Sequence, residues 1–144
     1  MNAGYDDILA CIESEKPAAQ DDFLRQLKLA RDTAIIRLLR LGLSLREVAN
    51  LDAEQIVRLP VPGLSGSAHF VEVMRGQPVR FRLDPAAVNS LHRYLMLRGS
   101  QKRRIFLRVR KQTPISHTDI AMLLSDIRQG LAGKTHDEKR EVAK

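Results

Sequence analysis

The segment Arg31–Leu51, RDTAIIRLLRLGLSLREVANL, constrains the fold more than any other part of the chain. Up to Leu41 its apolar residues recur every three or four positions, which is the period of a helix with one buried face. Gly42 ends that helix. Ser44 and Glu47 then have the spacing of a capping box, in which each side chain accepts a hydrogen bond from the other residue's backbone N–H. The segment therefore predicts two helices joined by a tight turn.

The remaining apolar pattern predicts further helices and several short strands. Asp84 followed by Pro85 is typical of a helix start, and Ser116 is a candidate N-cap. Arg75-Gly76-Gln77-Pro78 predicts a hairpin between two strands. The whole chain, 1–144, is expected to form one α+β domain, mainly α, with helices around a small three-stranded antiparallel sheet and a charged tail, 133–144, that is a short helix or frayed. The expected helices are Asp6–Ser14, Asp21–Leu41, Pro85–Arg98 and a helix after Ser116 to about Gln129, and Phe23 and Leu24 are expected on the buried face of the second. The expected extended segments are Ile56–Leu59, His69–Met74, Val79–Leu83 and Ile105–Val109.

The net charge of +7 is unevenly spread along the chain. Residues 1–30 hold six acids against three bases, whereas residues 72–112 hold eleven Lys and Arg against only Glu72 and Asp84. A basic middle on a near-neutral scaffold favours an anionic partner, with nucleic acid as the first candidate. The aromatic residues of strand and helix patterns are expected in the core, which argues against binding of single strands by stacking; they are Phe70, Phe81, Tyr94 and Phe106.

Several function classes lack their sequence signals. No apolar run approaches the roughly 18 residues of a membrane span, and the acidic N-terminus does not resemble a secretory signal. A single cysteine, Cys11, forms no internal disulfide. His69, His92 and His117 are too far apart to suggest zinc, and no phosphate-binding loop is present. We therefore expect a cytoplasmic protein, nucleoid-associated if it binds DNA, with no metal, no cofactor and no membrane contact.

One interpretation of GLSLREVANL is a simple helix-turn-helix. That motif needs a recognition helix rich in polar groups that reach base edges. The segment that follows, Ala53–Leu59, is short, largely apolar and ends at prolines. The helix-turn-helix is therefore the weaker alternative.

The order of motifs over about residues 6–140 resembles the catalytic domain of tyrosine recombinases, the phage integrases. The two-helix segment is similar to the first motif of that family, and Arg75 stands on the hairpin where the family has a basic residue. A proline-initiated helix, a short strand and a Pro-Ile-Ser helix follow in the family's order. Thr135-His136-Asp137 stands where the family has His-x-x-Arg.

The departures from the family pattern fall on its catalytic residues. Ser44 stands where the family has an arginine that grips the scissile phosphate. Lys139 occupies the place of the second arginine, and Arg140 is one residue late. No tyrosine follows Tyr94, so the nucleophile is missing. Because phosphoryl transfer needs several cations and a nucleophile held in place, the resemblance implies the fold without strand cleavage, and we expect no enzyme activity.

The leading hypothesis is a non-catalytic double-stranded DNA-binding protein that acts as a regulator or accessory factor of DNA recombination or of a mobile element. Its expected partner is duplex DNA. A second copy of the chain and a recombinase are further candidate partners. Alternation over the strand 105–109 predicts that Arg104, Arg108 and Arg110 share one face. The expected DNA-contacting residues are Arg46, Arg75, Arg80, Arg82, Lys102, Arg103, Arg104, Arg108, Arg110, Lys111, His136 and Arg140.

Two further alternatives stay open at this stage. In the first, the chain is a truncated piece of a site-specific recombinase active in DNA integration, and residues beyond Lys144 supply the tyrosine. In the second, it is a protein-interaction module that no longer binds DNA. In that case the acidic N-terminal helices or the tail would carry the contact.

Overall fold

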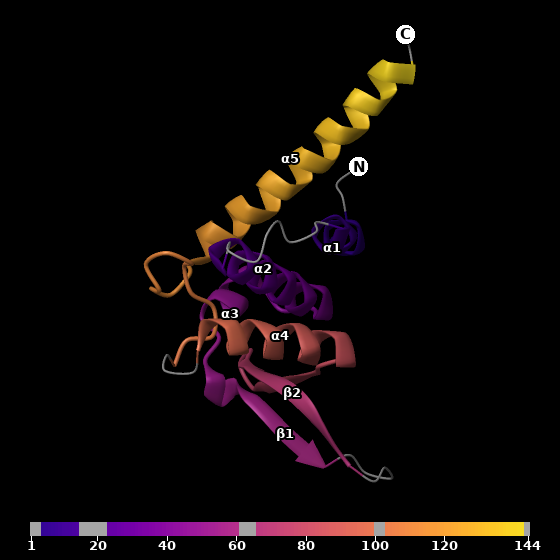
Figure 1. Ribbon diagram of the computed structural model, residues 1–144. Coiled ribbons are helices and arrows are strands. Elements are labelled where there is room, and N and C mark those ends of the chain that lie inside the picture. Colours follow the sequence, from indigo (N-terminus) through magenta and orange to yellow (C-terminus); the bar gives the residue numbers. More distant parts are fainter. Residues whose placement is uncertain (1–3, 15–22, 61–65, 100–102, 143–144) are drawn as a thin grey trace.

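The computed structural model describes residues 4–14, 23–60, 66–99 and 103–142, including their side chains except at 13, 14 and 132–142 (Figure 1). This part of the chain is mainly helical with a small antiparallel sheet, as the sequence predicts. The helices are α1 (Tyr5–Ser14), α2 (Phe23–Leu41), α3 (Leu45–Ala49), α4 (Pro85–Arg98) and α5 (His117–Val142), with a one-turn 3-10 helix η1 (Ala53–Gln55), and the strands are β1 (Ile56–Pro60), β2 (Ser67–Met74) and β3 (Pro78–Arg82). None of these helices has the length and apolar character needed to cross a membrane.

The helices stack in layers on one side of the sheet (Figure 1). α4 lies next to the sheet and packs against α2, which in turn packs against α1. α5 contacts α1 and α3. Side chains from all these layers meet in one continuous core, which includes Ile8, Ile35, Val71, Leu91 and Ile120.

The predicted buried face of the long helix α2 is confirmed along most of its length. Leu27, Ile35 and Leu38 are nearly inaccessible to solvent. The prediction is wrong at the first turn, where Phe23 and Leu24 are 51% and 45% exposed. The apolar period continues there, but none of the described residues covers that turn.

The sheet is an antiparallel meander in the order β1-β2-β3. Its register places Phe70 opposite Val57 on one side and Arg82 on the other. Val71 and Val73 are buried under the helices. Since successive side chains of a strand point to opposite faces, Phe70 and its cross-strand partners point away from the helices.

The prediction of a strand over Ile105–Val109 is wrong. Residues 104 and 107 make only isolated bridges, to Asp52 and Pro114. Ile105, Phe106 and Leu107 are buried one after another, with no alternation. The physical reason is that the segment is enclosed by several elements instead of lying flat on a sheet: its backbone bonds to Leu51 and Ile115 and to a side chain of α4.

Helix α5 begins where Ser116 predicts it but is longer than expected. The Asp119 N–H donates to Ser116 Oγ at 3.1 Å, and the Ser116 N–H donates to the Asp119 carboxylate at 3.0 Å. The helix continues past Gln129 to Val142, so the tail up to that residue is helical. Leu131, Ala132, Lys134 and the run Glu138–Glu141 are good helix formers, and they continue the helix despite Gly130 and Gly133.

Candidate nucleic-acid interface

The turn between α2 and α3 is closed by the predicted capping box. The Ser44 N–H donates to Glu47 Oε1 at 2.8 Å, and the Glu47 N–H donates to Ser44 Oγ at 3.1 Å. Gly42, with φ of 117°, lies against the Phe81 ring, and a Cβ there would stand 3.2 Å from it. Ser44 is therefore a helix cap at the position where the family resemblance implies a phosphate-binding arginine.

Arg75 ties the turn between β2 and β3 to this same corner. Its Nη2 and Nε donate to the two oxygens of Glu47 at 2.7 and 3.0 Å, and Nη2 also donates to the Gly42 carbonyl at 3.0 Å. The guanidinium carbon stands 5.1 Å from the centroid of the Phe81 ring. Chiefly through the hydrogen bonds from Arg75, the pKa of Glu47 falls from 4.5 to about 2.

Replacing Glu47 with glutamine is expected to lower the stability of the fold at neutral pH and to reduce its acid sensitivity. Because the folded-state pKa of Glu47 lies below the ordinary value, its contribution is fully present above pH 4.5 and is lost as the pH falls through about 2. Urea unfolding of wild type and E47Q should therefore differ at pH 7 and converge near pH 2.

The matched control is E54Q, which changes a carboxylate that is 77% exposed in its pair with Arg103. This variant should shift the urea midpoint little at either pH, since exposed pairs contribute little. An E47Q deficit of constant size across the whole pH range would contradict the role given to its carboxylate.

The first two cations of the segment 103–116 pair with acids that precede the sheet. Arg103 stands 3.2 Å from Glu54 and 3.4 Å from Asp52. Arg104 stands 3.2 Å from Asp52 and donates to the side chain of Asn50, the C-cap of α3, at 2.9 Å. These arginines are 70% and 40% exposed, so their ion pairs lie at the surface.

Further along, the backbone turns back at residues 108–113 and displays three more cations. The Arg108 N–H donates to the Thr113 carbonyl at 2.7 Å, which closes the turn. The Arg108 side chain pairs with Asp119 at the start of α5, at 3.0 Å. Arg110 and Lys111 are exposed and have no partner among the residues that the structure describes. The prediction that Arg104, Arg108 and Arg110 share a strand face is wrong, since there is no strand and two of them turn to separate acids.

Side chains of α2 and α4 fix the position of the segment 103–116 from its buried side. The Leu107 N–H donates to the Tyr94 hydroxyl at 3.1 Å, and the rings of Tyr94 and Phe106 stack with their centroids 5.5 Å apart. Arg31 donates to the Leu107 carbonyl at 3.3 Å, and Arg98 to the Arg104 carbonyl at 2.8 Å. Tyr94 is 1% exposed, and burial raises the pKa of its hydroxyl, so its predicted packing role is confirmed.

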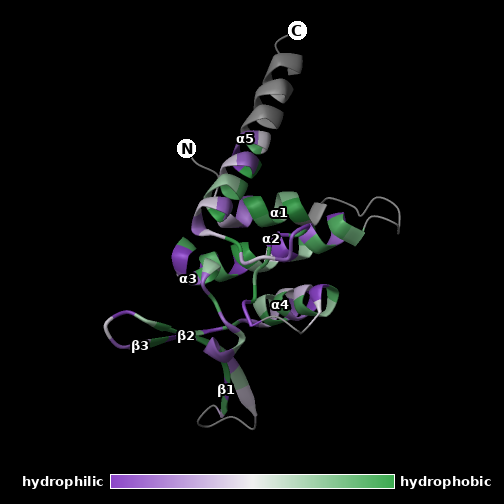
Figure 2. Cartoon of the chain, turned by 90° about the vertical axis from the view of Figure 1, so that its left-hand side faces the viewer, coloured by the Kyte–Doolittle hydropathy of each residue, from purple (hydrophilic) through white to green (hydrophobic). Residues whose placement is uncertain are grey.

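The contacts of Arg75 and Arg104 place cations of the hairpin turn and of the segment 103–116 beside α3. We call these residues, together with Arg46 of α3 and the other cations of the segment 103–116, the α3 basic region. In Figure 2 the hydrophilic residues of α3 lie at the edge of the body, on the side toward which the β2–β3 hairpin extends. The α3 basic region comprises Arg46, Arg75, Arg103, Arg104, Arg108, Arg110 and Lys111, and the acids among them are Glu47, Asp52, Glu54 and Asp119. Arg46, like Arg110 and Lys111, is exposed and unpaired among the described residues.

The other predicted DNA-contacting residues lie elsewhere. Arg80 and Arg82 are on the face of the sheet that points away from the helices, with Arg80 at 3.4 Å from Glu72. Lys102 is outside the described residues. His136, Lys139 and Arg140 lie in the last part of α5, where side chains are not described. The structure thus brings together the cations of α3, the hairpin turn and the segment 103–116, but not the whole predicted set.

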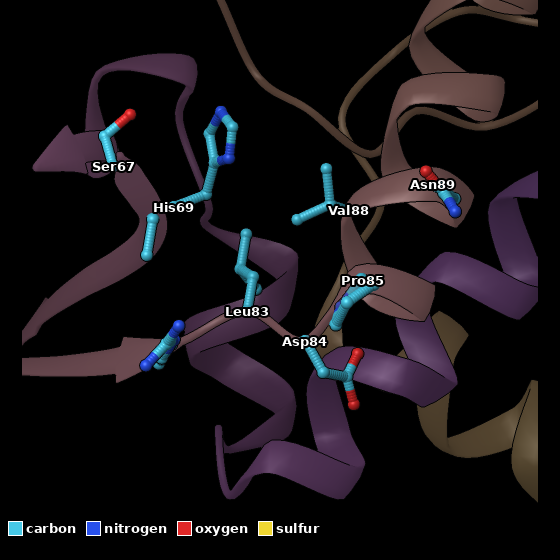
Figure 3. A pocket seen from close by; sticks show the side chains of 9 residues that line it. Ser67, His69, Leu83, Asp84, Pro85, Val88 and Asn89 are labelled. Carbon is cyan, nitrogen blue, oxygen red and sulfur yellow. The ribbon is translucent and has the colours of Figure 1, made fainter. Parts of the chain in front are cut away.

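A hollow of about 510 Å³ lies where the start of β2 and the end of β3 meet the N-terminus of α4 (Figure 3). Its lining mixes polar and apolar side chains, among them Ser67, His69, Val88 and Asn89. A second, mainly apolar hollow of about 280 Å³ adjoins it and also includes His92. Among the described residues, no three His, Cys, Asp or Glu side chains cluster as a metal site would require.

The fold and the surface charges define a class of protein: a small, mainly helical α+β domain that displays arginines around one short helix. Compared with known proteins, the chain matches no family model, no curated protein and no solved structure.

Proposed function

We propose that this protein is a non-catalytic double-stranded DNA-binding protein that contacts the phosphate backbone through the α3 basic region. It acts as a regulator or accessory factor of DNA recombination or of a mobile element, on a scaffold similar to the tyrosine recombinase catalytic domain. One observation carries the proposal: exposed cations from α3, from the hairpin turn and from the segment 103–116 converge on one region.

The ion pairs in this region do not prevent phosphate binding. Arg75 stays bound to both oxygens of Glu47, whereas Arg103 and Arg104 are 70% and 40% exposed in their pairs. Surface pairs of this kind are weak, so an arginine can exchange a carboxylate for a phosphate oxygen at small cost. The planar guanidinium binds either anion with two parallel hydrogen bonds. Arg46, Arg110 and Lys111 need no exchange at all, since they have no partner among the described residues.

The local chemistry supports binding without cleavage. Ser44 is occupied as a helix cap, and Arg75 is held by both oxygens of Glu47. The hydroxyl of Tyr94 is buried and bonded to the backbone, so it is not placed to attack a phosphate. The two helices around Gly42, the hairpin with Arg75 and the helix that starts at Pro85 follow one another in the order that the recombinase resemblance implies.

The proposal is tested by a salt series with the full chain and a fluorescently labelled duplex. We expect binding whose logarithmic affinity falls linearly with the logarithm of the salt concentration, with a slope of about −3 if only the three unpaired cations meet phosphates and a steeper slope if pairs exchange. Scrambling the duplex sequence should change the affinity little, because phosphate contacts carry no sequence information.

A parallel reaction on a nicked duplex serves as the activity control. No covalent protein–DNA complex should survive denaturing electrophoresis. Absence of duplex binding even at about 50 mM salt would reject the proposal, whereas a trapped covalent complex would reject its non-catalytic part.

A further inference from the structure

Among the described residues, no helix covers the face of the sheet opposite α4, which we call the open face. Val71 and Val73 fill the core, so their neighbours Phe70 and Glu72 point the other way. The described helices all lie on the core side of the sheet (Figure 1).

Phe70 lies at the centre of this open face. It is only partly buried, and it is not among the hydrophobic side chains that pack on the main core. Val57, its partner on β1, shares both properties. The sequence prediction that Phe70 belongs to the core is therefore wrong, because the described helices cover only one side of its strand and Phe70 points to the other.

Positive charge borders the aromatic ring. Arg82 stands directly opposite Phe70 on β3, is exposed and has no partner among the described residues. Two pairs further along, Arg80 lies opposite Glu72, the acid that this face carries on β2, at 3.4 Å. Neighbouring strands lie roughly 4.8 Å apart, so the long side chain of Arg82 reaches the backbone of a nucleotide whose base lies over Phe70.

We propose that this open face binds a single-stranded nucleic-acid segment, with one base stacked on Phe70 and its phosphate held by Arg82. Stacking on an aromatic side chain combined with a cationic border is the physical basis of single-strand binding, and it tolerates any base. Charge complementarity selects this occupant, since an apolar protein surface would cover Arg82 without neutralising it.

Arg82 stands at the end of β3, where it also borders the hollow beside α4. This surface goes beyond the proposed duplex binding and uses none of the α3 basic region, so either proposal can fail without the other.

The test measures fluorescence anisotropy of a labelled oligothymidine of about twelve nucleotides with the full chain. Phe70→Leu keeps the apolar character and removes the aromatic ring, whereas Phe70→Tyr keeps the ring. We expect F70L to bind the oligonucleotide roughly tenfold more weakly than wild type and F70Y to bind within about twofold of it. Duplex affinity should be the same in all three proteins.

A second measurement needs no variant at position 70. An oligonucleotide with 5-iodouracil, irradiated in complex with the wild-type chain, should cross-link to the peptide that contains Phe70. Equal oligonucleotide affinity in wild type and F70L, or cross-links confined to other peptides, would overturn the proposal. So would an absence of oligonucleotide binding at low salt, in which case self-association in sedimentation experiments would identify the face as a protein contact.

Discussion

Replacing Asp32 with alanine is expected to lower the free energy of unfolding by about 3–5 kcal/mol. Asp32 and Arg31 are 4% and 8% exposed, and Arg31 Nη2 lies 2.8 Å from Asp32 Oδ1. Without the carboxylate, Arg31 would stay buried with the Leu107 carbonyl, 3.3 Å away, as its remaining acceptor among the bonds described above. A buried charge left without its counter-charge carries most of its desolvation penalty. Urea unfolding followed by circular dichroism measures the loss.

Two further variants separate a buried charge from a general packing defect. Asp6→Asn breaks an ion pair with Arg40 of similar length, 2.9 Å, but Asp6 is 76% exposed, and we expect a loss below about 1 kcal/mol. Replacing both partners, Arg31→Met with Asp32→Leu, should recover much of the stability that the single change removes, because the charge that remains without a partner, Lys28 at 3.1 Å from Asp32, is 58% exposed and not buried. Equal losses for D32A and D6N would show that burial of the pair does not matter.

Replacing Arg46, Arg110 and Lys111 together with alanine is expected to flatten the salt dependence of duplex binding by roughly 2 to 3 units of slope. The corresponding loss of affinity at low salt is about a hundredfold. These three cations are chosen because each is exposed and unpaired among the described residues, so their removal leaves no acid without its partner. The salt series on the same labelled duplex measures both effects.

The choice of cations matters for the interpretation. Replacing Lys102, Arg103 and Arg104 also removes positive charge, but it would expose Asp52 and Glu54 to the DNA and add repulsion to the lost contacts. Arg40→Ala, which removes one charge beside the acidic helix α1, should leave the slope unchanged. A triple variant with the wild-type slope would place the DNA elsewhere on the protein.

Local sequence signals predicted the elements whose ends are set by local chemistry. Helix α4 runs from Pro85 to Arg98 as expected, because Asp84 accepts a hydrogen bond from the Ala87 N–H and Gly99 follows its last residue. The Ser44–Glu47 capping box is present atom for atom. Such motifs involve residues three or four positions apart, and the chain itself brings them together.

The charge balance of the candidate site could not be predicted from local sequence signals. Residues 98–111 contain seven bases and no acid, which predicted a strongly positive surface. In the fold, Arg103 meets Glu54 from 49 positions away, and Arg104 meets Asp52. The acids that pair with the basic segment are brought to it by the packing of η1 and of the start of α5, and no periodicity in the sequence signals such a contact.

The order β1-β2-β3 has a consequence for solubility, because it leaves both β1 and β3 as edges with unpaired backbone groups. Edges of this kind recruit strands from other molecules and seed aggregates. Here each edge strand is only five residues long, and Pro60 and Pro78, at the end of β1 and the start of β3, have no N–H to offer an incoming strand. Arg80 and Arg82 add like-charge repulsion between two β3 edges. The small sheet is thereby protected against open-ended growth into fibres.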